Sequence, residues 1–253
     1  MTAPAWLTAR PIAHRGLHAR ENGIIENTLS AAQAAIERGF SVECDVQPTG
    51  DGEAVVFHDF TVDRLTAGRG DVAKKSAADL SAIPLKDTAD RIPTLDAFLE
   101  TIAGRMPLII EIKSRYDGDW RLAERVAAII GDYDGPVALK SFDPFVIAHL
   151  RENAERLGTN RRPLGIVAEA RYDHGEESRL PQTVRDGLTA FLHYPQTRPD
   201  FLSWRVDDLP HAIPFLLRSQ LDTPVIAWTV RRDEQRERAA QWADQIVFEG
   251  FLP

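Results

Sequence analysis

The sequence lacks several features that define large classes of protein. Its only cysteine, Cys44, excludes an intramolecular disulfide and a cysteine-rich zinc site. No run of 18 apolar residues is present, and the first residues show no basic stretch followed by an apolar one. We therefore expect neither a signal peptide nor a membrane anchor. No GxGxxG or Walker-type glycine loop follows the first apolar run, which disfavours a nucleotide-binding open sheet.

Positive charge is also in short supply. The chain carries 30 Lys and Arg against 38 Asp and Glu, which leaves a formal net charge of −8. This sign is wrong for a protein whose main affinity is for nucleic acid or an anionic membrane, so no nucleic-acid partner is expected. A cytoplasmic enzyme or binding protein fits best. The oligomeric state is left open.

What the sequence does contain is a regular alternation of short apolar runs and amphipathic segments. This rhythm is typical of strands that alternate with helices around a parallel sheet. Eight runs are predicted to be strands: Ile12 to His14, Ser41 to Asp45, Leu108 to Ile112, Val137 to Ser141, Leu164 to Val167, Thr189 to His193, Val225 to Thr229 and Ile246 to Phe248. Eight β/α steps in 253 residues predict an α/β fold of the (β/α)₈ TIM-barrel type, in a single domain over residues 1–253.

Three amphipathic segments are predicted to be helices: Thr28 to Arg38, Thr94 to Ala103 and Trp120 to Ile130. Residues 46–57 interrupt the alternation, because an apolar run follows the second strand after only a short PTGDG segment. A parallel crossover needs a dozen or more residues, so this segment is predicted to be a hairpin. Residues 59–92 are predicted to form a small insertion on the rim, after the second strand.

Chemistry-bearing side chains gather where predicted strands end. Because strand side chains alternate, Glu43 and Asp45 share one face and Cys44 turns toward the helices as a small buried hydrophobe. Glu111 ends the next strand, so three carboxylates could converge on a hard divalent cation. Taken singly, each residue has a structural explanation such as an ion pair. Their convergence at the catalytic face of a barrel favours a site.

Several motifs, in order, resemble the glycerophosphodiester phosphodiesterase family. They are IAHRG, ENTLSAAQAAIERGF, VECDVQPTGDGEAVVFHDFTVDRLTAGRG, IPTLDAFLE, IIEIKS and VIAWTV. The resemblance is strong over residues 11–114 and continues more weakly to about residue 250. It implies a (β/α)₈ barrel with an insertion after the second strand, and hydrolysis of a small-molecule glycerophosphodiester to glycerol 3-phosphate and an alcohol.

The resemblance also implies roles for individual residues. His14 and His58 match the catalytic pair. Which of them is the acid and which the base is left open, with His58 as base and His14 as acid the preferred assignment. The other matches are the metal ligands Glu43, Asp45 and Glu111, for one Mg²⁺ or Ca²⁺ ion, and the phosphate-side groups Arg15 and Lys113. Trp228 could stack on the substrate or lie in the core, and Asn27 could brace the site or cap a helix.

The chain departs from the family pattern at its end, where IVFEGF replaces a Thr-Asp-x-Pro segment. Two other functions stay open at this point. One is a phospholipase D or lysophospholipase D acting on lipid diesters, which would need an exposed apolar rim. The other is a catalytically silent phosphate-binding barrel.

His193 is expected to lie at the end of a strand, where a structural role is favoured over a functional one.

Overall fold

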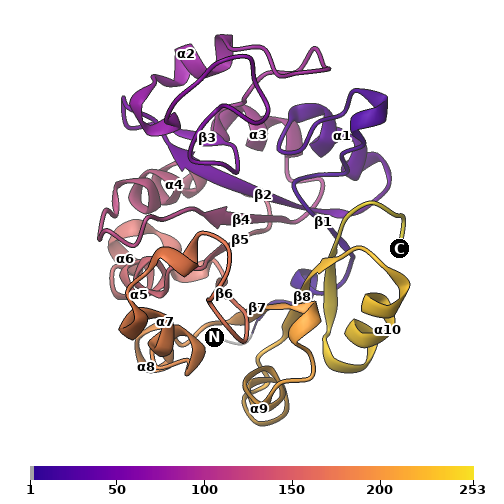
Figure 1. The fold of residues 1–253 in the computed structure, drawn as a ribbon, viewed down its shortest axis with the longest axis vertical. Coiled ribbons are helices and arrows are strands. Elements are labelled where there is room, and N and C mark those ends of the chain that lie inside the picture. Colours follow the sequence, from indigo (N-terminus) through magenta and orange to yellow (C-terminus); the bar gives the residue numbers. More distant parts are fainter. Residues whose placement is uncertain (1–2) are drawn as a thin grey trace.

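A closed ring of eight parallel strands forms the centre of the molecule (Figure 1). The structure is a computed structural model that describes residues 3–253. The ring consists of β1 (Ile12–Ala13), β2 (Ser41–Pro48), β4 (Leu108–Ile112), β5 (Val137–Ser141), β6 (Leu164–Ala168), β7 (Phe201–Arg205), β8 (Val225–Val230) and β9 (Gln245–Phe248). It closes because β1 pairs in parallel with both β9 and β2. The predicted (β/α)₈ barrel is confirmed.

Helices cover the outside of the ring. The α-helices are α1 (Leu29–Glu37), α2 (Ala77–Ala82), α3 (Leu95–Ile102), α4 (Arg121–Gly131), α5 (Pro144–Glu152), α6 (Ala154–Leu157), α7 (Gln182–Thr189), α8 (Tyr194–Thr197), α9 (Ala212–Leu221) and α10 (Asp233–Trp242). Short 3₁₀ turns are η1 (Ala5–Leu7), η2 (Arg20–Asn22), η3 (Val72–Lys74), η4 (Thr159–Arg161), η5 (Glu177–Arg179) and η6 (Val206–Asp208). Thr28, Thr94 and Asp143 accept the capping bonds of α1, α3 and α5. Each such cap stabilises its helix by about 1 kcal/mol.

The alternation of strand side chains divides the core in two. Outward residues such as Cys44 and Ile110 are fully buried between strands and helices, as predicted for Cys44. Inward residues such as Ile12 and Phe201 fill the bottom of the barrel. Gly165 makes room for Phe201, because a Cβ at this position would lie 2.3 Å from the Phe201 ring. The apolar bottom leaves the opposite mouth of the barrel for polar side chains.

The prediction for the sixth of the eight strands, Thr189 to His193, was wrong. Residues 189–193 end α7 and turn into α8, with Leu192 69% exposed, and the strand lies at Phe201–Arg205 instead. The apolar residues of TAFLH belong to a helix end whose buried member is Phe191. The true strand reads FLSWR. Because its inward positions Ser203 and Arg205 are polar, it does not form the continuous apolar run by which the other strands were predicted. His193 precedes α8 and lies away from the barrel mouth, against Thr197.

The interruption after the second strand is a hairpin, as predicted. β3 (Ala54–Val56) pairs antiparallel with the extended end of β2 and stands outside the ring. Residues 59–92 continue from it, and their buried Val62, Leu65 and Leu80 form a separate small core with Phe57. In Figure 1 this region, with α2, lies beyond the β2 side of the ring. The hairpin thus extends one wall of the barrel mouth.

Within residues 3–253, no helix combines the length and the apolar character that crossing a bilayer requires.

Candidate active site

Inward-facing polar residues form a layer at the carboxyl ends of the ring strands. The strand register places Asp45 beside Glu111, and Glu111 beside Lys140. On the other side of the ring, Arg205 lies in register with Trp228. In a (β/α)₈ barrel this face carries the active site. The order of polar residues around the mouth therefore follows directly from strand pairing.

A cavity of about 440 Å³ opens over this layer. Seven of the nine residues predicted for the site line it: His14, Arg15, Asp45, His58, Glu111, Lys113 and Trp228. The other two, Asn27 and Glu43, are buried and bonded to cavity residues instead. The sequence-based set is therefore brought together, with Asn27 behind the surface that a substrate could touch.

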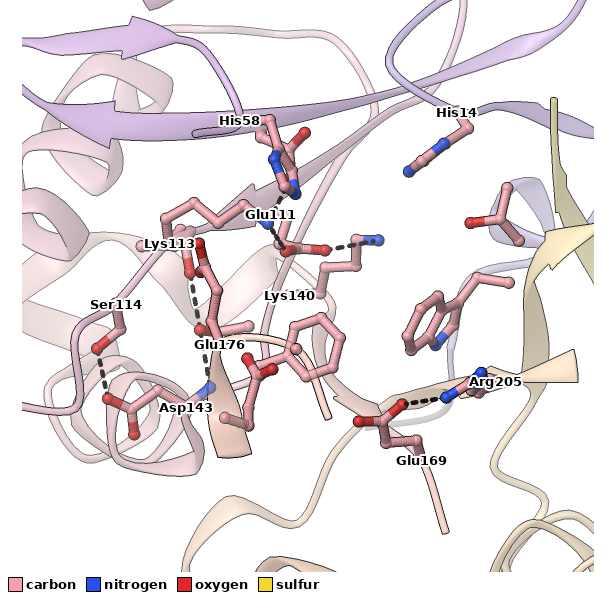
Figure 2. Close-up of a pocket in the computed structure, with 18 of the residues that line it drawn as sticks. His14, His58, Glu111, Lys113, Ser114, Lys140, Asp143, Glu169, Glu176 and Arg205 are labelled. Atoms are coloured by element: carbon pink, nitrogen blue, oxygen red, sulfur yellow. Dashed lines mark hydrogen bonds and ion pairs between the residues drawn. The ribbon is translucent and has the colours of Figure 1, made fainter. Parts of the chain in front are cut away.

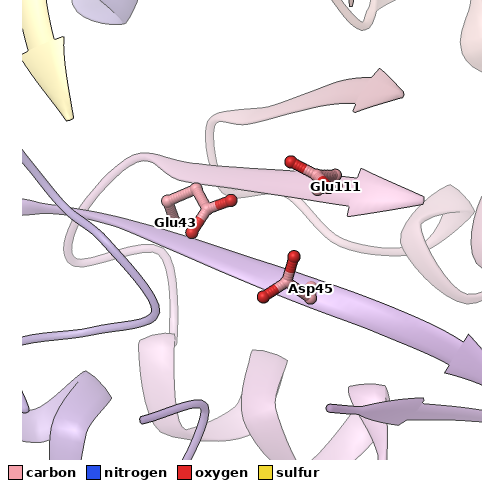
Figure 3. A group of neighbouring side chains, drawn as sticks. All are labelled: Glu43, Asp45 and Glu111. Atoms are coloured by element: carbon pink, nitrogen blue, oxygen red, sulfur yellow. The ribbon is translucent and has the colours of Figure 1, made fainter. Parts of the chain in front are cut away.

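Three neighbouring carboxylates, which we call the carboxylate floor, lie together on β2 and β4 (Figure 3), and two of them, Asp45 and Glu111, line the cavity. Glu43, Asp45 and Glu111 are each buried, and one oxygen of each lies within 4.8 Å of the others. Lys113 Nζ is 2.9 Å from Asp45 Oδ1 and 2.5 Å from Glu111 Oε1. Lys140 Nζ is 3.0 Å from Glu43 Oε1 and 3.2 Å from Glu111 Oε2. The floor is thus dense in charge and balanced by two lysines.

Arg15 and Asn27 complete the surroundings of the floor. Arg15 donates its backbone N–H to Glu43 and places Nε 3.1 Å from Asp45 Oδ2. Asn27 donates Nδ2–H to the same oxygen and accepts the backbone N–H of Asp45. Both residues have positive φ, 55° for Arg15 and 60° for Asn27. Such conformations are costly outside glycine and concentrate at functional sites, where surrounding contacts hold them.

Opposite charges outweigh burial in the floor. Burial alone would raise the pKa of Glu111, but Lys113 and Lys140 bring it down to about 2. Burial acts in the same direction on Asp45, yet Lys113 and Arg15 hold its pKa well below its usual range. Asp45 and Glu111 are therefore anionic at neutral pH, which is the form that ligates a cation.

His14 is held by a carboxylate from the end of the chain. Its Nδ1 lies 2.6 Å from Glu249 Oε2, and Arg231 Nη2 lies 2.7 Å from the same oxygen. Burial would raise the pKa of Glu249, but His14 and Arg231 lower it, so the carboxylate is ionised and can only accept. Nδ1 of His14 therefore carries the hydrogen, which leaves Nε2 free for proton transfer. Glu249 was noted in the sequence only as a departure from the family pattern.

His58 is held in the same way by its neighbour in sequence. Nδ1 of His58 lies 2.7 Å from Asp59 Oδ1, and Arg64 donates to both oxygens of Asp59. Arg64 also pairs with Glu26, which pairs in turn with Arg15. A chain of alternating charges therefore links the support of His58 to the floor.

The opposite side of the cavity was not predicted. We call it the far wall: Asp143, Glu169, His174, Glu176, Glu177 and Arg205. Glu169 lies 3.1 Å from Arg205 and 3.5 Å from His174. Figure 2 shows Glu169, Arg205, Glu176 and Asp143 across the cavity from His14 and His58. Aromatic Tyr116, Phe142 and Trp228 also line the cavity.

Fold and site define a (β/α)₈ barrel whose polar mouth holds carboxylates, lysines and two imidazoles. The family model of the glycerophosphoryl diester phosphodiesterase family matches residues 14–250, so the chain belongs to this family. The chain is 35% identical over 159 residues to a glycerophosphodiester phosphodiesterase of Caldanaerobacter subterraneus subsp. tengcongensis, with 58% of this chain and 63% of that protein aligned. It is 30% identical over 158 residues to rat glycerophosphodiester phosphodiesterase 1, with 58% and 47% aligned. These alignments span about half to three-fifths of the length of the relatives.

A solved structure gives the same fold. It is an Oleispira antarctica phosphodiesterase in complex with the product sn-glycerol-3-phosphate, with a TM-score of 0.74 and 21% identity. The match covers 94% of this chain and 91% of that one. At this identity the likeness shows the fold alone.

Proposed function

We propose that the chain hydrolyses glycerophosphodiesters to glycerol 3-phosphate and an alcohol. One observation carries the proposal: two carboxylates of the floor, Asp45 and Glu111, line the same cavity as the two tethered imidazoles. Family membership supports it, as does the name of the relative aligned over 58% of the chain. Hydrolysis of a phosphodiester requires a nucleophile, a proton for the leaving alcohol and neutralisation of charge on the phosphate oxygens. The cavity offers groups for each task.

The carboxylate floor suits one divalent cation, Mg²⁺ or Ca²⁺. Calcium binds oxygens at about 2.3–2.6 Å, so ligands on opposite sides of it lie about 5 Å apart. The 4.8 Å limit that encloses oxygens of Glu43, Asp45 and Glu111 meets this requirement. The lysines occupy one lone pair of each contacted oxygen and leave another for an ion. Such an ion would polarise a phosphate oxygen and lower the pKa of a bound hydroxyl.

The histidines would move the protons. Because Nδ1 of each is held by a carboxylate, Nε2 is the nitrogen available to the substrate. His58 accepts the proton of the attacking glycerol hydroxyl, and His14 gives a proton to the departing alcohol. Attack by the glycerol's own hydroxyl forms a cyclic phosphate, which water then opens to glycerol 3-phosphate. An imidazole suits both tasks because its ordinary pKa lies near neutrality.

Basic side chains at the floor would hold the phosphate. Arg15 and Lys113 line the cavity, and each also contacts Asp45. Opposite charge within about 4 Å is worth several times more here than in bulk water, since the site is largely buried. Trp228 lines the same cavity and offers its ring to the organic part of the substrate. Asn27, held against Asp45, positions that carboxylate and does not contact the substrate.

Assays of the purified protein test this proposal. We expect turnover of glycerophosphocholine with Mg²⁺ or Ca²⁺ and its loss with chelator. His14→Ala and His58→Ala should each lower kcat by roughly 10²–10⁴-fold. His149→Ala, outside the cavity on α5, is the matched control and should keep wild-type kcat. Near-wild-type kcat in either cavity variant removes that histidine from the mechanism.

The lipid-directed alternative lacks a suitable surface. Six large apolar side chains are more than half exposed within residues 3–253: Phe145, Leu192, Phe215, Leu216, Leu221 and Leu252. None of the six lines the cavity, and most of the residues that do line it are polar or charged. A lipid substrate would need apolar surface at the mouth. Water-soluble diesters therefore fit the cavity better than lipid diesters.

The other alternative, a catalytically silent phosphate-binding barrel, would show phosphate-dependent thermal stabilisation without turnover of any diester.

A further inference from the structure

The far wall has an excess of negative charge. Among its carboxylates, Glu169 is paired with Arg205 and His174. Glu176 and Glu177 form no ion pair within the described chain, although both line the cavity. Asp143 accepts hydrogen bonds from Ser114 and from the first turn of α5, neither of which is cationic. Four carboxylates thus face one guanidinium and one imidazole.

The acids of the far wall are held in unfavourable surroundings. Burial raises the pKa of Glu177 and outweighs the opposing effect of Lys113, and the negative charges of Glu176 and Glu111 act in the same direction as burial. Burial likewise raises the pKa of Glu169 to about 7, against the opposing effects of His174 and Arg205. A positive charge beside them would relieve both groups, because opposite charge favours the ionised carboxylate.

Aromatic rings line the cavity beside members of the far wall, since Phe142 precedes Asp143 in the chain and Trp228 lies in register with Arg205. Phe142 and Trp228 meet edge to face, with ring centroids 5.3 Å apart. Trp228 donates its indole N–H to Ser203 O at 2.9 Å, which fixes the ring. The Tyr116 hydroxyl is buried, lines the cavity wall and has no hydrogen-bond partner within residues 3–253. Burial, with Glu177 nearby, raises the pKa of Tyr116 well above its usual value, so the hydroxyl keeps its proton.

Carboxylates and aromatic faces together recognise ammonium groups. The ring face attracts a cation through its quadrupole, and the carboxylate supplies full opposite charge. A neutral polyol or an anionic alcohol would leave Glu176 and Glu177 uncompensated beside it. The unused Tyr116 hydroxyl can donate to an oxygen of the same ligand. The Phe60 ring is less available, because the Arg115 guanidinium lies 4.3 Å above it.

Building on the proposed function, we propose that the far wall binds the alcohol half of the substrate and selects alcohols that carry an ammonium group. The preferred substrates are then zwitterionic glycerophosphodiesters, with the phosphate at the floor and the ammonium between Glu177, Glu176 and the rings of Phe142 and Trp228. This charge separation matches the cavity, whose phosphate end holds Arg15 and Lys113 and whose other end holds the excess acids.

A pair of substrates that differ only in charge tests the inference. Glycerophosphocholine is compared with its 3,3-dimethylbutyl isostere, in which a carbon atom replaces the quaternary nitrogen. We expect wild-type kcat/KM to favour the choline ester by about tenfold or more, the size of a desolvated cation–π and carboxylate contact. Glu177→Gln should bring this ratio close to one, mainly through KM. Asp173→Asn, in the same loop but not in the cavity wall, is the matched control and should keep the wild-type ratio.

The outcomes separate this inference from the proposed function. Turnover of both esters with a ratio near one in the wild type overturns the far-wall inference and leaves the hydrolase intact. No turnover of either ester overturns the proposed function itself. If Glu177→Gln fails to fold, Glu176→Gln and competition by tetramethylammonium on the wild type replace it. Absence of competition on the choline ester also counts against the far wall.

Discussion

The carboxylate floor and the far wall are two acidic regions of one cavity with opposite electrostatics. In the floor, Lys113, Lys140 and Arg15 accompany three carboxylates, and the pKa of Glu111 falls to about 2. In the far wall, acids outnumber bases, and the pKa of Glu169 rises to about 7. Burial is similar for Glu111 and Glu169, 5% and 4% exposed, so it cannot explain the difference. The number of nearby cations decides whether a buried carboxyl is ionised.

The largest effect is expected from removing a floor carboxylate. Glu111→Gln takes away one proposed metal ligand and the partner of both lysines, so kcat should fall on the order of 10³-fold. The measurement is kcat with saturating Mg²⁺ or Ca²⁺, together with metal-dependent thermal stabilisation, which should also be lost. Retention of both in Glu111→Gln would show that the floor is only a structural ion-pair cluster.

Removing a floor cation should reduce stability strongly. Lys140→Met leaves Glu43 without its lysine, and stripping one partner from a buried pair costs about 3–5 kcal/mol. Arg205→Met, the equivalent change in the far wall, should cost about 1 kcal/mol or less, since Arg205 is partly exposed and its partner can take up a proton. Urea unfolding at pH 7 gives both values. Equal losses would contradict the contrast between the two regions.

The support of His14 should affect rate more than stability. Glu249→Gln removes the charge that fixes Nδ1–H of His14, so kcat should fall roughly tenfold to a hundredfold, part of the contribution of a positioned acid or base. The readout is the pH profile of kcat, in which the limb assigned to His14 should move. Glu249→Asp should restore much of the rate. A fall in stability with an unchanged profile would indicate a purely structural role.

The smallest effect is a change in the pH dependence of stability. Because folding raises the pKa of Glu169 from 4.5 to about 7, the folded state binds the proton more tightly, and stability is lost as pH rises across this window. Glu169→Gln should remove that slope, with a change on the order of 1–3 kcal/mol at pH 8. Folding lowers the pKa of Glu26 to about 2, so its contribution is present above pH 4.5 and lost toward pH 2. Unfolding curves from pH 3 to 8 compare the variants Glu169→Gln and Glu26→Gln.

Much of the barrel could be predicted from local sequence. Strands buried on both faces read as continuous apolar runs, which is why β4 and β5 were placed to the residue. β7 was not predicted, because its inward positions at the barrel mouth are polar. Polar inward residues are what a functional barrel end requires. The apolar criterion therefore fails at the strand that contributes Arg205 to the site.

The site divides in the same way. His14, Glu43, Asp45 and His58 lie in short motifs on adjoining strands, so their convergence could be predicted. Glu249 meets His14 across 235 residues, through the pairing of β9 with β1. Arg205 meets Glu169 across 36 residues, through the register of β6 with β7. Such contacts depend on which strands pair in the closed ring and in what register, and a local sequence pattern carries no information about this pairing.

The hairpin of β2 and β3 has a consequence for how this chemistry can change. His14 directly follows the ring strand β1, whereas His58 comes after β3, a short strand outside the ring that pairs with β2 at three register positions. The distance between the two imidazoles is therefore adjustable by altering the length or twist of a short arm, at little risk to barrel closure. A chain built in this way can acquire new substrates by re-aiming one histidine while the scaffold beneath it stays as it is.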